Sequence, residues 1–144
     1  MIEDQLYRET LLDLYRNPKN KGELPNYDIE VYDLNPLCGD EIKIQLKFKS
    51  KQGLRSNELQ KATRPSDGQE GKIIEKAVFS GNGCAISQAS AEILTGYIKG
   101  KNLEELKNLQ TTDLLRMVGI NPPPARLNCA LLSLIVLKKA LVRN

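Results

Sequence analysis

The apolar residues of the chain follow two periodicities, one typical of strands and the other typical of helices. Residues 41–49 alternate between apolar and polar side chains, so that Ile42, Ile44, Leu46 and Phe48 share one face. A period of two predicts a strand with one solvent-facing side. Shorter patterns of the same kind predict strands over 28–34 and 72–80.

Helical spacing dominates the rest of the chain. Residues 3–16 mix leucines with charged side chains, and Asn17-Pro18 ends this segment because proline restricts the residue before it. Further helices are expected over four segments, 85–99, 103–108, 112–118 and 125–142. Strands followed by helices favour an α+β fold over alternating βαβ units. We therefore expect a small antiparallel three-stranded sheet packed against about five helices.

One segment and one helix stand apart from this pattern. Residues 50–71 are polar and rich in glycine, which predicts a mobile loop between two strands. The helix over 125–142 is apolar nearly all round, so it must be covered by the domain core, by a partner or by a second copy. A length of 144 residues fits a single domain over 1–144.

Charge and hydropathy exclude several classes of partner. The net charge is +3, from 21 basic and 18 acidic residues that are evenly mixed, whereas nucleic-acid binding is typical of a clustered basic patch. No apolar run approaches the ~18 residues that cross a bilayer. The first residues are acidic, unlike the basic start of a signal peptide. These features predict a cytoplasmic protein with neither a nucleic-acid nor a membrane partner.

The chain has no histidine and only three cysteines, Cys38, Cys84 and Cys129. Without histidine, neither a Cys–His nor a Ser–His catalytic pair can form. An odd number of cysteines in a cytosolic protein argues against a disulfide framework. The three residues are then inert core thiols, reactive thiols or metal ligands.

A metal site is one interpretation of these cysteines. Each lies at the end of a predicted element, and Asp40 follows Cys38 by two residues, so both side chains can point to one face. Three thiolates and a carboxylate would complete a tetrahedral zinc site or hold iron. The hard aspartate oxygen would be the most easily exchanged ligand. Burial as small core residues explains the spacing of the cysteines equally well.

Five motifs resemble, in order, the iron–sulfur scaffold family that includes the IscU, NifU and SufU proteins. They are Asp-Gln-Leu-Tyr-Arg at 4–8 with Asp-Leu-Tyr-Arg-Asn-Pro-Lys-Asn-Lys-Gly at 13–22, Asn-Pro-Leu-Cys-Gly-Asp at 35–40, Ser-Gly-Asn-Gly-Cys-Ala-Ile-Ser-Gln-Ala-Ser at 80–90, Lys-Gly-Lys at 99–101, and Pro-Ala-Arg-Leu-Asn-Cys-Ala-Leu at 124–131. The Gly-Cys-Ala-Ile-Ser form is closest to the SufU branch. The resemblance spans nearly the whole chain outside residues 50–71.

The resemblance implies an IscU/NifU-like fold and a scaffold role without catalysis of its own. Such proteins accept persulfide sulfur from a pyridoxal-phosphate cysteine desulfurase of the SufS, IscS or NifS type. IscU-type members assemble a [2Fe–2S] cluster and pass it to apo iron–sulfur proteins or carriers, whereas SufU-type members bind zinc and act mainly as sulfurtransferases. By resemblance, the ligands of iron, the cluster or zinc are Cys38, Asp40, Cys84 and Cys129.

The branch and the acceptor cysteine stay open. Cys38 is the favoured persulfide acceptor by resemblance to SufU-type proteins, and Cys129 is the alternative by resemblance to IscU-type scaffolds. Arg126 matches a SufU-branch arginine that could hold a thiolate or persulfide ionised. Asn128 replaces the histidine of IscU-type scaffolds, yet the chain lacks the SufU-type insertion before Cys129. A purely structural zinc module is a third possibility, and self-association is compatible with all three.

Overall fold

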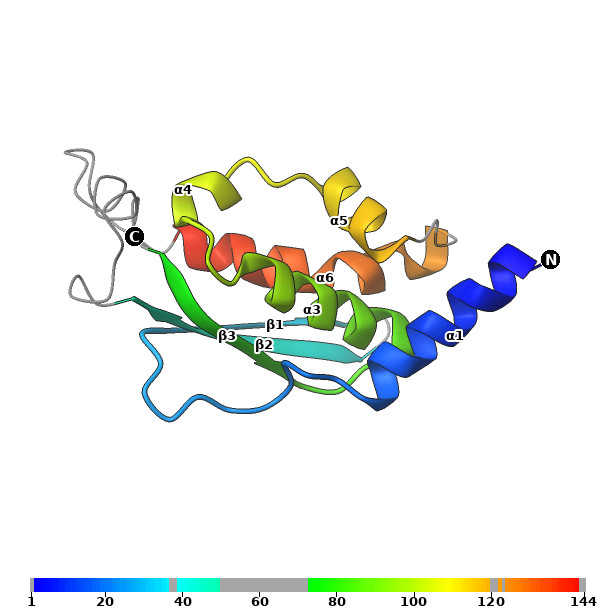
Figure 1. The fold of residues 1–144 in the computed structure, drawn as a ribbon, viewed down its shortest axis with the longest axis horizontal. Helices are drawn as coiled ribbons and strands as arrows, with labels where there is room; N and C mark the ends of the chain where they lie inside the picture. Colours follow the sequence, from blue (N-terminus) through cyan, green and yellow to red (C-terminus); the bar gives the residue numbers. More distant parts are fainter. Residues whose placement is uncertain (1, 37–38, 50–72, 120–121, 123, 143–144) are drawn as a thin grey trace.

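The computed structural model describes residues 2–36, 39–49, 73–119, 122 and 124–142. These residues form five helices and a three-stranded antiparallel sheet, as predicted (Figure 1). The elements are α1 (Ile2–Arg16), β1 (Ile29–Asn35), β2 (Asp40–Phe48), β3 (Ile74–Ser80), α3 (Ala85–Ile98), α4 (Leu103–Leu106), α5 (Thr111–Val118) and α6 (Pro124–Val142). The predicted loop at 50–71 lies outside the described residues.

The central strand, β2, pairs with β1 on one side and with β3 on the other. Val31 faces Ile44 across the first pair, and Leu46 faces Ala77 across the second. Ile42, Ile44 and Leu46 are fully buried under the helices, as the alternation of residues 41–49 predicts. Each such side chain contributes roughly 1.5–3 kcal/mol through burial.

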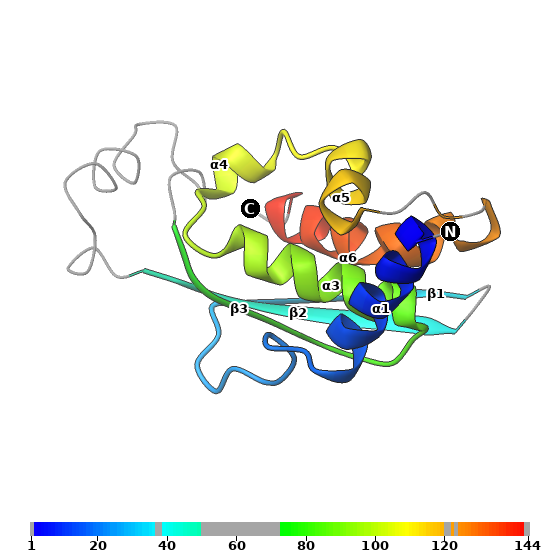
Figure 2. The same cartoon turned by 45° about the vertical axis from the view of Figure 1, so that its right-hand side comes forward.

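The helices form two layers above one face of the sheet. Helices α3 and α6 lie directly on the sheet, and α4 and α5 lie above them, as both views show (Figures 1 and 2). Small residues at the start of α3, including Ser87 and Ser90, are fully buried and allow close packing. Helix α6 is mostly core, as expected, but Ile135 is left 44% exposed.

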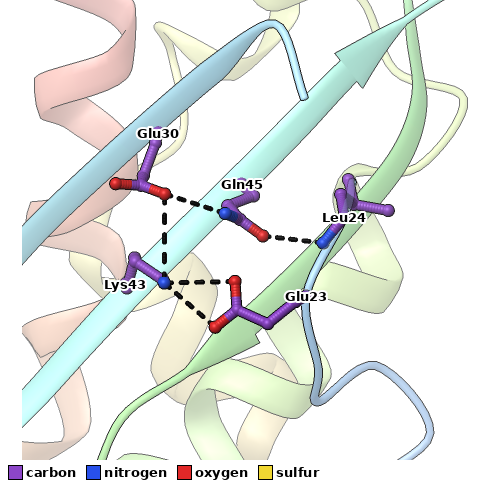
Figure 3. Close-up of polar contacts among 5 residues, drawn as sticks. All are labelled: Glu23, Leu24, Glu30, Lys43 and Gln45. Carbon is purple, nitrogen blue, oxygen red and sulfur yellow. Dashed lines mark hydrogen bonds and ion pairs between the residues drawn. The ribbon is translucent and has the colours of Figure 1, made fainter. Parts of the chain in front are cut away.

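The opposite face of the sheet carries polar contacts that hold Glu23 and Leu24 against it (Figure 3). Gln45, nearly buried, accepts a hydrogen bond from the Leu24 N–H and donates one to Glu30, each at 2.8 Å. Lys43 bridges Glu23 at 3.0 Å and Glu30 at 3.9 Å. Burying a polar group costs little free energy when the group has a hydrogen-bond partner. The segment can therefore cover this face of the sheet without an apolar layer between them.

A buried carboxylate fixes the turn between α1 and β1. Glu92 of α3 is 5% exposed and accepts hydrogen bonds from the backbone N–H groups of Lys19, at 2.7 Å, and Asn20, at 3.0 Å. The same segment runs beside β3, where Gly22 donates to the Phe79 carbonyl and Phe79 donates to Asn20. Glu92 thereby holds both the end of α1 and the segment that runs beside the outer edge of β3.

Element ends lie within two residues of the prediction, and two of the differences have a clear physical cause. Helix α4 ends at Leu106, two residues early, because Lys107 and Asn108 bond to carbonyls three residues back in a tighter turn. Helix α6 begins at Pro124, whose missing N–H costs nothing in a first turn. No helix in the described part of the chain has the length and apolarity to cross a membrane.

Candidate metal centre

Three segments far apart in the sequence meet at one end of the sheet. Asp40 begins β2 and points to the helix side, in phase with Ile42 and Ile44. Cys84 precedes α3 in the turn after β3, and Cys129 lies on α6. One carboxylate oxygen and the two sulfurs all lie within 4.8 Å of one another.

These donors are suited to a transition metal. Tetrahedral ligands about 2.3 Å from zinc are separated by roughly 3.6–3.8 Å. The Asp40 Oδ2 and Cys84 Sγ atoms are already 3.8 Å apart, so binding needs only a small contraction. Asp40 is 3% exposed and Cys129 is fully buried, whereas Cys84 is half-buried and faces the open side.

The turn at 81–84 is built for close approach. The backbone N–H of Cys84 donates to Asp40 Oδ1 at 3.1 Å. A Cβ atom on Gly83 would lie 2.9 Å from that oxygen and 2.4 Å from Ser87 Oγ, so any larger residue would displace one or both side chains. Gly81 has φ +125° and passes so near Glu41 that a side chain there would strike its carbonyl.

The start of α3 holds Cys84 from the other side. Its carbonyl accepts hydrogen bonds from the Gln88 N–H at 3.1 Å and from Ser87 Oγ at 3.0 Å. The serine-to-carbonyl bond and the Gly83 clearance were not anticipated, although the Gly-x-Gly-Cys spacing could have indicated a close backbone contact.

Arg126 lies on the first turn of α6, exposed and beside both described thiols. The negative charge of Cys84 raises the pKa of the Arg126 guanidinium above its usual range, and a hydrogen bond to Cys129 acts in the same direction. The sequence had suggested contact with a thiolate or persulfide in general. In the structure the guanidinium reaches two sulfurs that come from different segments.

Of the predicted site residues, Cys38 lies outside the described residues. Asn128, which replaces the histidine of IscU-type scaffolds, is exposed on α6. The hairpin that contains Cys38 is bracketed by Asn35, paired with Asp40, and by Gly39, whose N–H donates to the Asn35 carbonyl at 2.9 Å. The structure thus brings together Asp40, Cys84, Cys129 and Arg126.

Comparison with known proteins extends the resemblance over the whole chain. The zinc-dependent sulfurtransferase SufU of Bacillus subtilis (strain 168) is 33% identical over 158 aligned residues, which cover 98% of this chain and 92% of that protein. The iron–sulfur cluster assembly scaffold protein IscU of Escherichia coli (strain K12) is 31% identical over 138 residues, covering 94% and 91%.

Solved structures of related proteins have the same fold. FiSufU from Fervidobacterium islandicum AW-1 superposes with a TM-score of 0.68 at 25% identity, covering 95% of this chain and 97% of that one. The N-terminal part of a NifU-like protein from Brucella abortus, at 18% identity and a TM-score of 0.63, shares the fold. The family model described as NifU-like N terminal domain matches residues 6–57 and 67–143, and the chain belongs to that family.

Proposed function

We propose that this protein is an iron–sulfur cluster assembly scaffold whose metal ligands are Cys38, Asp40, Cys84 and Cys129. The observation that carries the proposal is the convergence of Asp40, Cys84 and Cys129 from three distant segments to within 4.8 Å. Soft thiolates suit iron, a [2Fe–2S] cluster or zinc. A single hard oxygen gives the set one ligand that is easily exchanged, which suits release of the bound group.

Sulfur would arrive as a persulfide on a pyridoxal-phosphate cysteine desulfurase. The acceptor thiolate attacks the outer sulfur of that persulfide; a new S–S bond forms, and the desulfurase thiolate leaves. The transfer is therefore balanced without an external oxidant. Full burial of Cys129 argues against Cys129 as the acceptor, because an incoming persulfide needs an accessible sulfur. Cys38 is favoured through the resemblance to SufU-type proteins. Assembled clusters would then pass to apo iron–sulfur proteins or carriers.

A second candidate function is zinc-dependent sulfur transfer without cluster assembly. Two observations favour it, the similarity to the Bacillus subtilis SufU and the position of Arg126 beside two thiols. Exchange of the Cys38 sulfur on zinc for another ligand would free that thiolate for attack, and a guanidinium nearby would keep it ionised.

One assay separates sulfur transfer from a purely structural zinc site. The purified protein is incubated with a cysteine desulfurase and cysteine, and persulfides are located by alkylation and mass spectrometry. We expect a persulfide on the wild type that is lost in Cys38→Ser and kept in Cys129→Ser. Loss only in Cys129→Ser would make Cys129 the acceptor. Unmodified cysteines with zinc retained would leave only the structural module.

A scaffold and a zinc-dependent sulfurtransferase differ in the group they bind, which is a cluster in the first and zinc in the second. Iron and sulfide are supplied anaerobically to the wild type, and transfer of the resulting cluster to an apo ferredoxin is followed by absorbance. A scaffold is expected to form and release a [2Fe–2S] cluster. Persulfide formation with zinc retained and no cluster would favour the zinc sulfurtransferase.

A further inference from the structure

A groove with a volume of about 920 Å³ runs along the open edge of the sheet. Its floor is residues 30–32 of β1, one wall is the flank of α6 around Ile135, and the other wall is residues 109–111. None of the described metal-site residues lines it. The groove is therefore a surface separate from the metal centre.

The two edge strands of the sheet, β1 and β3, differ in what covers their outer sides. The outer edge of β3 is covered by residues 20–22 and by residues 100–102, where Lys101 accepts from the Ile74 N–H. Among the described residues, strand β1 pairs with β2 and with no other segment. The Leu34 N–H bonds to the Asp33 side chain at 2.8 Å, so it points away from β2, and the Tyr32 N–H shares that direction because strand groups alternate. An open edge of this kind accepts a further strand.

Apolar side chains border this edge. Ile135 is 44% exposed and Tyr32 is 47% exposed, although most apolar side chains of α6 are buried. The nearly uniform apolarity of residues 125–142 is thus only partly explained by the domain core. An aliphatic side chain laid over Ile135 would complete the burial of this helix.

Two lysines, Lys138 and Lys139, line the groove together with one carboxylate, Glu30, which is bonded to Gln45. The Lys138 ammonium donates to the carbonyls of Lys107, at 3.0 Å, and Leu106, at 3.5 Å. Carbonyl groups are neutral, so they do not balance the charge of the Lys138 ammonium. No carboxylate among the described residues forms an ion pair with it. Lys139 pairs with Asp33 at 3.0 Å. A partner side chain that reaches Lys138 is therefore favoured if it is acidic.

We propose that this groove binds an extended acidic segment of a partner protein, which adds as a strand to β1. The segment places an aliphatic side chain on Ile135 and a carboxylate, two residues away on the same face, at Lys138. Main-chain hydrogen bonds to the outward groups of Tyr32 supply affinity, and the two side chains supply specificity. Because the groove lies apart from the metal ligands, the segment binds whether or not metal is present.

The test uses the full chain and the capped peptide Thr-Glu-Thr-Val-Thr-Glu-Thr, whose acidic and aliphatic side chains share one face in either direction. Titration followed by NMR is expected to shift the amide signals of residues 30–34 and 134–139, with a Kd below about 1 mM. A control peptide with lysine in place of both glutamates is expected to bind at least about tenfold more weakly.

Two pairs of variants locate the contact. Ile135→Glu is expected to weaken binding at least about tenfold, whereas Leu12→Glu, at a leucine of α1 that is 38% exposed, leaves it unchanged. Tyr32→Pro removes the outward N–H and is expected to abolish binding. Proline is tolerated on edge strands, and Tyr32→Ala, which keeps the N–H, retains binding.

Three outcomes would overturn the proposal. They are absence of binding by the acidic peptide, equal binding of the acidic and basic peptides, and an Ile135→Glu variant that binds like the wild type. A wild type that dimerises, and that becomes monomeric in Ile135→Glu, would assign the groove to a second copy instead.

Discussion

The backbone N–H of Cys84 donates a hydrogen bond to Asp40 Oδ1 at 3.1 Å, while Asp40 Oδ2 lies 3.8 Å from the Cys84 sulfur. One carboxylate oxygen is thus held by the protein, and the other is turned toward the thiols. Asp40 is oriented to offer a metal a single oxygen. The arrangement depends on a backbone that comes within contact distance of the carboxylate, which Gly83 permits.

Replacing Gly83 tests this arrangement. In Gly83→Ala the new Cβ would lie 2.9 Å from Asp40 Oδ1 and 2.4 Å from Ser87 Oγ, so the carboxylate must shift. Groups that orient ligands typically contribute about 10- to 100-fold to metal affinity, and we expect a loss of that size for zinc, measured by competition with a chromophoric chelator. Gly96→Ala in α3 is the control and should leave zinc affinity unchanged. Wild-type affinity in Gly83→Ala would contradict the orienting role.

Removing the Asp40 carboxylate should change release more than assembly. If Asp40 is the labile ligand, Asp40→Ala is expected to make a reconstituted cluster last longer, as followed by the decay of visible absorbance under air. Asp33→Ala, at a carboxylate paired with Lys139 rather than with a thiol, is the control. An unchanged or shortened lifetime would mean that Asp40 does not ligate the cluster.

Local pattern predicted most of the fold. The alternation of residues 41–49 gave the central strand and its buried face, and the apolar run at 125–142 indicated a largely buried helix. The early end of α4 and the exposure of Ile135 were not predictable. Both depend on which distant segments lie beside them, and periodicity carries no information about that.

The sequence also predicted some features of the candidate site and not others. Residue type and position at element ends singled out Asp40, Cys84 and Cys129, and the structure brings all three together. The clearance at Gly83 and the approach of Arg126 to Cys84 as well as Cys129 were not foreseen. The first arises where the turn after β3 meets Asp40 and Ser87, and the second where α6 approaches that turn. Local sequence specifies neither contact.

The ion pair between Asp33 and Lys139 should make stability depend on pH. The hydrogen bond from Lys139 lowers the pKa of Asp33 below its ordinary value of 3.8. The contribution is therefore present above about pH 4 and is lost as the pH falls through the lower, folded-state pKa. Because the pair is partly solvated, we expect Asp33→Asn to lose only about 0.5 kcal/mol at pH 7 in urea unfolding.

The pH series supplies the check on this pair. The difference between wild type and Asp33→Asn should shrink toward zero at pH 2.5 and also in high salt, which screens partly exposed charges. A difference that stays constant across pH would show that the ion pair does not stabilise the fold.

The buried Glu92 carboxylate should matter more than any surface charge. In Glu92→Gln the remaining oxygen can accept from the Lys19 N–H, and the new NH₂ group then faces the Asn20 N–H, which Oε2 accepts at 3.0 Å in the wild type. Leaving such donors unsatisfied costs about 1–3 kcal/mol, measured by urea unfolding. Glu75→Gln, at an exposed carboxylate of β3, is the control and should change stability by less than about 0.5 kcal/mol. Equal stability of both variants would remove Glu92 as the anchor of the α1–β1 turn.

Metal binding should stabilise the whole domain, because its proposed ligands come from segments that are held together only in the folded state. At zinc concentrations a thousandfold above Kd the gain is about 4.1 kcal/mol. For a chain of this size that corresponds to a rise in Tm of roughly 10 °C, measured by calorimetry with and without a chelator. Cys84→Ala removes one sulfur and should abolish most of the rise. If zinc stabilises Cys84→Ala as much as the wild type, the metal is bound elsewhere on the protein.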